Sequence, residues 1–87
     1  MYIILVYDIG EKRVGKMLKL CRQYLNWIQN SVFEGELTNS KLQELTIKIK
    51  SLIDTKEDSV ILFTNKMDYN MNKQIIGKER MDVDNFL

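Results

Sequence analysis

Two short apolar runs without regular polar alternation dominate the pattern of the chain. The first covers residues 2–7 and ends at Asp8, and the second covers residues 59–64. A strand that faces water on one side alternates polar and apolar side chains, whereas a strand covered on both sides reads as a continuous apolar run. The pattern therefore predicts two fully buried central strands, the first of which ends in a carboxylate.

Two amphipathic helices are predicted between these runs. Over residues 12–25, apolar side chains recur at helical spacing and form one stripe, made of Val14, Met17, Leu18, Cys21 and Leu25. Thr38 is a suitable N-cap for the second helix, which is predicted to end near Asp54. Its stripe consists of Leu42, Leu45, Ile49, Leu52 and Ile53.

Residues 27–37 favour extended structure, because β-branched and aromatic side chains occur there with alternating glutamates. Asn30-Ser31 is a weak turn signal and Gly35 suits a β-bulge, so the segment forms either one kinked strand or two. Residues 55–58 read as a turn and residues 65–72 as a loop, and a short edge strand is predicted at 73–77.

The order strand, helix, extended region, helix, strand predicts an α+β fold of the ferredoxin-like, split βαβ kind, with both helices on one face of an antiparallel sheet. We expect one domain over residues 1–87, with a core at 1–77 and a tail at 78–87 that lies at a dimer or partner interface. A chain of 87 residues buries only about 60–65% of its unfolded surface. Because the central strands are apolar on both sides, a sheet-to-sheet homodimer is predicted.

The N-terminal apolar run is far shorter than the roughly 20 residues of a membrane span, and no basic segment precedes it. The single cysteine, Cys21, falls on the apolar stripe of the first helix, which fits a reducing compartment. We therefore expect a cytoplasmic protein that is not associated with a membrane.

Charge is distributed unevenly, although the net charge is only +1. Five cations and no acid occupy residues 12–22, namely Lys12, Arg13, Lys16, Lys19 and Arg22. Such a stripe either attracts a phosphate backbone or forms a solvated helix face. Asp8 is equally open to two interpretations, since a carboxylate at a strand end either binds metal or substrate or pairs with Lys12 or Arg13.

Three segments together resemble the CRISPR-associated Cas-two family of small spacer-acquisition subunits. They are Tyr7-Asp8-Ile9, the basic residues 12–19, and Gln29-Asn30-Ser31-Val32-Phe33-Glu34-Gly35. The last segment is the most specific, and the chain length, second helix and second apolar run also fall where that family has them. The glycine usual after the tyrosine of the first helix is replaced by Leu25-Asn26, and Trp27 stands where many relatives carry a basic residue.

The resemblance implies a ferredoxin-like homodimer that acts as a Mg²⁺-dependent endonuclease, on single-stranded RNA in some members and on double-stranded DNA in others. It also implies a partnership with dimers of the CRISPR integrase (Cas-one) during spacer acquisition. Two alternatives remain: a non-catalytic adaptor that bridges integrase dimers on spacer DNA, or a generic ferredoxin-like nucleic-acid-binding module.

The same resemblance implies that Asp8 is the metal-binding and catalytic residue. Mg²⁺ prefers oxygen ligands and is often held by one or two carboxylates, which two Asp8 side chains of a dimer would supply. The chain contains no histidine, so an imidazole base is excluded and the base is an ionised water or an acid such as Asp8. Candidate nucleic-acid contacts are Lys12, Arg13, Lys16, Ser31 and Phe33.

Overall fold

The computed structural model describes residues 1–65 and 71–79, which form five strands and two helices. The strands are β1 (Tyr2–Asp8), β2 (Asn26–Gln29), β3 (Val32–Glu36), β4 (Ser59–Asn65) and β5 (Asn72–Gly77). The helices are α1 (Glu11–Arg22) and α2 (Asn39–Leu52). Both predicted helices and both predicted central strands are therefore confirmed.

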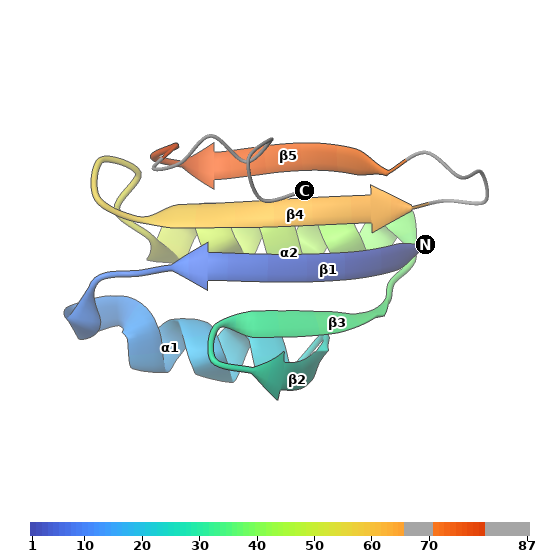
Figure 1. Cartoon of the computed structure of the whole chain (residues 1–87), viewed down its shortest axis with the longest axis horizontal. Coiled ribbons are helices and arrows are strands. Elements are labelled where there is room, and N and C mark those ends of the chain that lie inside the picture. The colour runs from blue at the N-terminus through green and yellow to red at the C-terminus, as the bar shows by residue number, and fades with distance from the viewer. Residues whose placement is uncertain (66–70, 80–87) are drawn as a thin grey trace.

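The strands form one antiparallel sheet in the order β2-β3-β1-β4-β5, with both helices on the same face (Figure 1). β3 lies between β1 and β2, and β1 lies between β3 and β4, so each helix connects two strands that are separated by a third. Two such split βαβ units make the ferredoxin-like fold, which confirms the predicted class. β5 extends this arrangement as an edge strand beside β4.

The core lies between the helices and the sheet. Thr38 caps α2 as predicted, since its side chain accepts a hydrogen bond from the backbone N–H of Lys41 at 3.2 Å. On α1 the predicted stripe is correct for Met17 and Cys21, but Val14 remains 38% exposed. The largest fully buried side chains of the helices are Met17, Leu45, Ile49 and Cys21.

The two faces of β1 differ in burial, although its sequence does not alternate. The side chains of Ile3, Leu5 and Tyr7 are buried under the helices, whereas Ile4 and Val6 are only partly buried on the opposite face. The prediction of a strand covered on both sides is therefore wrong for the single chain. The open face of the sheet is nevertheless apolar at its centre, with Ile4, Val6, Val32, Ile61, Phe63 and Ile75 at matching register positions.

Residues 27–37, for which the sequence predicted either one kinked strand or two, form parts of two strands, β2 and β3, joined by a tight turn. Asn30 adopts a left-handed conformation with φ of 46°, which asparagine tolerates better than most residues. The register shifts between Trp27 and Gln29, so the bulge lies in β2 rather than at Gly35 as predicted. Gly35 is instead packed closely by Leu25, whose Cδ2 would lie 3.1 Å from an added Cβ.

The end of β5 is tied to the turn that precedes β4. The backbone N–H of Lys78 donates to the carbonyl oxygen of Asp58 at 2.7 Å, and Gly77 adopts a φ of +90° that favours glycine. Of the predicted tail, residues 80–87 lie outside the described part of the chain. Within the described residues, neither α1 nor α2 is long and apolar enough to cross a membrane.

Candidate functional site

Asp8 is exposed at the end of β1, and two residues separate it from the start of α1. It stands opposite Ser59, the first residue of β4, in the antiparallel register. Side chains two positions apart along a strand point to the same face of the sheet, so Asp8 lies on the open face together with Ile4 and Val6. The carboxylate that the sequence singled out is thus accessible to a ligand.

A second carboxylate, Asp58, lies one residue before Ser59 and is fully buried, with 0% of its surface exposed. Arg13 of α1 donates to it twice, from Nε at 2.6 Å and from Nη2 at 3.1 Å. The backbone N–H groups of Gly10 and Asp54 also donate to its oxygens, at 2.8 and 2.9 Å respectively. We call this group of Asp58, Arg13, Gly10 and Asp54 the Asp58 cluster.

The Asp58 cluster connects segments that are far apart in sequence. Gly10 belongs to the two-residue link between Asp8 and α1, and Asp54 follows α2. The hydrogen bonds from Arg13 hold the pKa of Asp58 well below its usual range and outweigh burial, which acts in the opposite direction. A charged Asp58 therefore fixes the position of the link that follows Asp8.

The sequence did not identify Asp58 as a functional residue. It belongs to the polar cluster 55–58, which was predicted only as a turn. Its partners Gly10 and Arg13 are more than forty residues away, at separations of 48 and 45 positions. The only local signal is its place as an acid immediately before a central strand.

Arg13 was predicted to contact phosphate, and the structure places its guanidinium against carboxylates instead. Besides its two bonds to Asp58, Nη2 lies 3.1 Å from Oε2 of the exposed Glu57. These contacts use the N–H donors of Nε and Nη2 of the guanidinium. Its phosphate contact stays a prediction that the observed pairing does not support.

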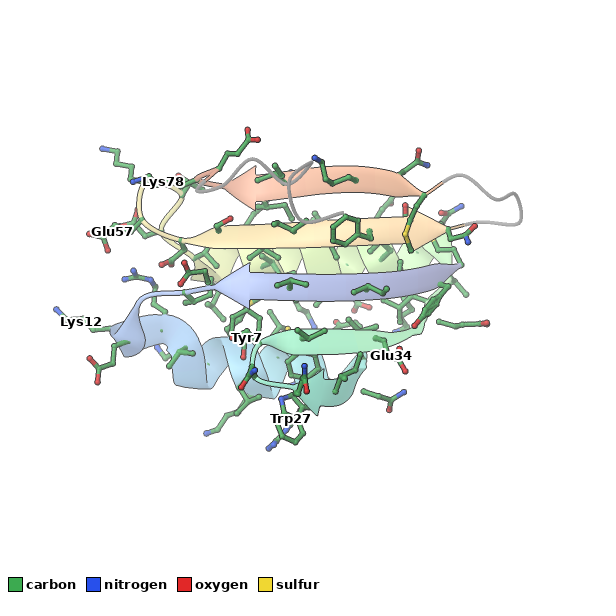
Figure 2. The ribbon with its side chains drawn as sticks, viewed as in Figure 1. Tyr7, Lys12, Trp27, Glu34, Glu57 and Lys78 are labelled. Atoms are coloured by element: carbon green, nitrogen blue, oxygen red, sulfur yellow. The ribbon has the colours of Figure 1, made fainter. Side chains whose placement is uncertain are left out.

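The other predicted cations lie on the exposed side of α1. Lys12 and Lys16 are exposed, as are Lys19 and Arg22, and within the described residues none of the four forms an ion pair. Figure 2 shows Lys12 at the same end of the sheet as Glu57 and Lys78, where β1 ends. Exposed cations therefore follow α1 along its length, and the exposed acids Glu11 and Glu57 lie near its first turn.

Ser31 and Phe33 differ in their access to a ligand. The partly buried Ser31 lies in the β2–β3 turn, where its carbonyl oxygen accepts from the N–H of Tyr7 at 3.1 Å. Phe33 is fully buried and stacks on Tyr7, with ring centroids 6.1 Å apart. Phe33 packs in the core against Tyr7. A direct contact of Phe33 with nucleic acid stays a prediction.

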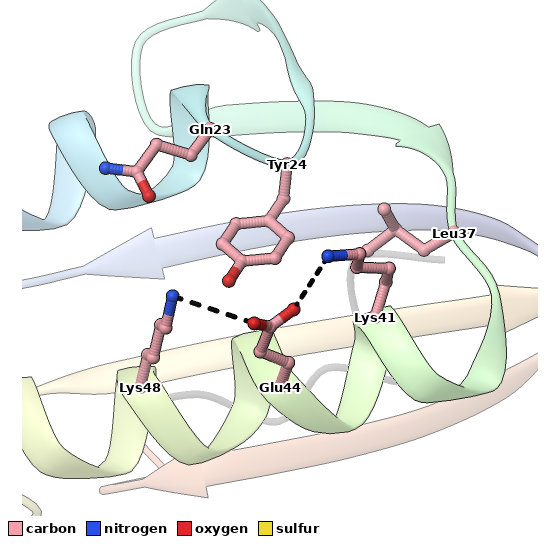
Figure 3. Close-up of a pocket in the computed structure, with 6 residues that line it drawn as sticks. All are labelled: Gln23, Tyr24, Leu37, Lys41, Glu44 and Lys48. Carbon is pink, nitrogen blue, oxygen red and sulfur yellow. Dashed lines mark hydrogen bonds and ion pairs between the residues drawn. The ribbon is translucent and has the colours of Figure 1, made fainter.

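A hollow of about 450 Å³ lies between the end of α1 and α2, away from Asp8 (Figure 3). Glu44 lies between two lysines there, with its carboxylate 3.2 Å from Lys41 Nζ and 3.9 Å from Lys48 Nζ. The hydrogen bond from Lys41 lowers the pKa of Glu44, and Lys48 Nζ also lies 5.3 Å from the ring centre of Tyr24. Lys41, Glu44 and Lys48 all lie on α2, so these ion pairs stabilise one helix and leave an excess of positive charge beside the hollow.

The described residues contain no group of three or more histidine, cysteine, aspartate or glutamate side chains placed to hold a metal ion. Asp58 accepts from Arg13 and from backbone donors, whereas Asp8 is exposed at the end of β1. One or two carboxylates and several waters suffice for Mg²⁺. The donor set therefore fits a magnesium ion held by Asp8, alone or with a second copy of Asp8.

Comparisons with known proteins agree with this fold and identify the family. The model of the family described as "CRISPR associated protein Cas2" matches residues 1–71. A protein of Thermotoga maritima named "CRISPR-associated endoribonuclease Cas2" is 48% identical over 80 residues, which cover 92% of each chain. One of the same name from Methanocaldococcus jannaschii is 39% identical over 87 residues, which cover 100% of this chain and 76% of that one.

Solved structures show the same likeness. A structure titled "Crystal structure of cas2" is similar with a TM-score of 0.69 and 38% identity, over 94% of this chain and 80% of that chain. Streptococcus pyogenes Cas2, solved at pH 6.5, is similar with a TM-score of 0.70 and 28% identity, over 79% and 90% respectively. With a family match across most of its length, an exposed aspartate at the end of β1 and a ferredoxin-like sheet, this chain belongs to the Cas2 family.

Proposed function

We propose that this protein is a metal-assisted endonuclease that also takes part in CRISPR spacer acquisition with the CRISPR integrase. The observation that carries the proposal is the exposed Asp8 at the end of β1, which the chain follows with the helix α1 and its exposed cations. Several relatives are named endoribonucleases, which favours RNA as the substrate. Double-stranded DNA is the second candidate substrate.

The chain's own residues supply two parts of this function. Lys12 and Lys16 attract the phosphate backbone without regard to sequence, and Asp8 lies where that backbone would meet the sheet edge. Mg²⁺, when bound at Asp8, would supply positive charge beside the phosphodiester and favour ionisation of a water. The Asp58 cluster keeps the link after Asp8 in place, so Asp58 is a positioning residue.

A homodimer completes this proposal. The open face of the sheet carries apolar side chains on four neighbouring strands, β3, β1, β4 and β5, including Val6, Ile61 and Phe63. A contiguous apolar face of this kind is typical of a protein–protein contact. Contact between two such faces would bring a second Asp8 toward the first. Phe63→Glu is expected to give a monomer in analytical ultracentrifugation, whereas Ile47→Glu, on the 68% exposed Ile47 of α2, leaves the dimer intact.

The nuclease is tested by cleavage of single-stranded RNA and double-stranded DNA, with and without Mg²⁺. Asp8→Asn is expected to lower the rate on the order of 100-fold or more, because it removes the charged ligand while keeping the side chain's shape. Glu36→Gln is the matched control, since Glu36 is an exposed carboxylate at the opposite end of the sheet. Equal cutting by wild type and Asp8→Asn would place the activity elsewhere or in a contaminant.

The adaptor role is separable from catalysis. Asp8→Asn is expected to retain integrase binding and spacer insertion, whereas removal of residues 82–87 is expected to weaken co-purification with the integrase. Full assembly without residues 82–87 would reject their part in it. A generic binder, by contrast, would show steep salt dependence and loss of affinity on neutralising Lys12, Arg13 and Lys16, with no need of metal.

A further inference from the structure

A second hollow, of about 440 Å³, lies between α1 and the β2–β3 hairpin. Its walls include Val14, Gly15, Leu18 and Arg22 of α1, and Trp27 and Ser31 from the hairpin side. A Cβ added at Gly15 would meet no atom within 4 Å, so the space above this part of the helix is open. The volume falls within the ~300–1,000 Å³ typical of small-ligand sites.

Trp27 is the main feature of this hollow. Its side chain is 53% exposed, which is unusual for the largest apolar residue type. The indole is nevertheless oriented, because Nε1–H donates to the carbonyl oxygen of Asn30 at 2.9 Å across the tight turn. In Figure 2, Trp27 projects from β2 at the margin of the molecule. The hollow therefore has an exposed aromatic surface held by a hydrogen bond of its own hairpin.

The charge around the hollow has one sign. Among the described residues that line it, Arg22 is the only charged one. Lys19 is exposed on the same helix one turn after Gly15, and α1 carries Glu11 as its only acid, at the opposite end. A ligand that suits this place has a flat face to stack on Trp27 and a negative group within reach of α1.

We propose that Trp27 stacks with an unpaired base of a single-stranded nucleic acid, while Arg22 and Lys19 contact the adjoining phosphates. Stacking on an exposed aromatic is available to every base and requires that the base has left a duplex. This site rests on the proposed nucleic-acid function and specifies its substrate as single-stranded.

The hollow lies beside α1 on the helix-covered side of the sheet, whereas Asp8 lies at the end of β1 on the open face. Asp8 precedes the N-terminal end of α1, whereas Arg22 is its last residue. A strand that follows the exposed cations of α1 would reach from Trp27 toward Asp8. The base on Trp27 would thus anchor a single strand whose backbone runs along α1 toward the end of β1.

Trp27 is the only tryptophan of the chain, so its fluorescence reports on this site alone. We would titrate the full-length protein with short oligouridine and oligoadenine RNA and with duplex DNA of the same length, with metal removed by a chelator so that nothing is cut. The single strands are expected to quench Trp27, and the duplex is expected to quench it far less. Binding of labelled RNA, followed by anisotropy, without any quenching would overturn the proposal.

Variants test the stacking contact separately from the charge. Trp27→Ala is expected to weaken single-strand binding by about 5- to 150-fold, whereas Trp27→Phe retains most of it. Ile47→Ala removes another exposed apolar side chain, far from the hollow on α2, and is expected to leave binding unchanged. Circular dichroism verifies that each variant is folded. An equal loss in Trp27→Ala and Ile47→Ala, or no loss in either, would contradict the site.

Gly15→Leu provides an independent test that keeps Trp27 as the reporter. Leucine is a better helix former than glycine and finds open space at this position, so the fold is retained. Its side chain would fill the hollow and is expected to abolish quenching by RNA. Quenching equal to wild type would reject the hollow as the binding place.

These outcomes are distinguishable from failure of the nuclease. Quenching by single strands with no cleavage in Mg²⁺ would leave the Trp27 site standing and remove the catalytic role of Asp8. Cleavage that depends on Asp8 but is unaffected by Trp27→Ala and Gly15→Leu would leave the nuclease standing and reject the Trp27 site.

Discussion

Asp8 and Asp58 carry the same chemical group at the same end of the sheet, yet their surroundings are opposite. Asp8 is exposed at the end of β1, and Asp58 is fully buried directly before the residue that faces Asp8 across the sheet. Four hydrogen bonds converge on the carboxylate of Asp58, two of them from Arg13. Burial with complete pairing makes one carboxylate structural, and exposure leaves the other accessible to a ligand.

The comparison also separates two kinds of basic residue on α1. Arg13 points to Asp58 and Glu57, while Lys12 and Lys16 are exposed. A stripe of cations in sequence is therefore not a single surface in space. Four predictions, ordered by the size of their effect on stability, test how complete this division is.

Asp58→Ala is expected to produce the largest loss, about 4 kcal/mol of unfolding free energy, because it leaves Arg13 and two backbone donors without their acceptor. Glu57→Ala, which removes only the exposed partner of Arg13, is expected to cost less than about 1 kcal/mol. Urea denaturation of both variants measures the difference. Similar losses in the two would show that burial of Asp58 contributes little.

Arg13→Gln is expected to cost somewhat less, about 3 kcal/mol, since it leaves a buried carboxylate with its backbone donors but without a counter-charge. The variant also decides the role of Arg13. If its contacts are structural, RNA affinity measured at a temperature where the variant is folded stays close to wild type. Unchanged stability with a large loss of affinity would instead assign Arg13 to phosphate.

Acid is expected to produce a smaller loss, because protonation of Asp58 retains part of its hydrogen bonding. The pKa of Asp58 is lowered in the folded protein, so its contribution is present above the unfolded pKa of about 4 and disappears as the pH falls through the lower folded value. Thermal unfolding between about pH 5 and about pH 2 measures this slope. Asp58→Asn is expected to flatten it.

Asp8→Asn is expected to change stability least, within about 1 kcal/mol, because Asp8 is exposed. The same variant is expected to lose metal-dependent cleavage. Urea denaturation and the cleavage assay, performed on one preparation, test both parts. A loss of stability as large as that of Asp58→Ala would remove the contrast between the two carboxylates.

Sequence reasoning succeeded where the determining contacts are local. The Thr38 cap, the helical stripes and the turn at Asn30 each depend on residues a few positions apart. The register shift in β2 was placed wrongly at Gly35, because the close approach of Leu25 and a true bulge both require a small residue in a strand. Local pattern does not distinguish these causes.

Contacts between distant segments escaped prediction. In sequence, Asp58 is one of the four polar residues 55–58 and cannot be told apart from the other three. Its burial depends on contacts with Arg13 and Gly10, which are far away in the chain. Val14 was assigned to the core by its spacing, but it borders the hollow beside Trp27. The apolar open face of β1 led to a prediction of full burial that one chain by itself does not provide.

Cys21 has a practical consequence for experiments on this protein. Its thiol is fully buried, and burial raises its pKa to about 12, so little thiolate exists at neutral pH. Maleimide reagents should therefore not react with Cys21 in the folded protein. They should react selectively with a cysteine engineered at an exposed position. The chain has no other cysteine, so the rate at which Cys21 itself is modified would report how often the helices open from the sheet.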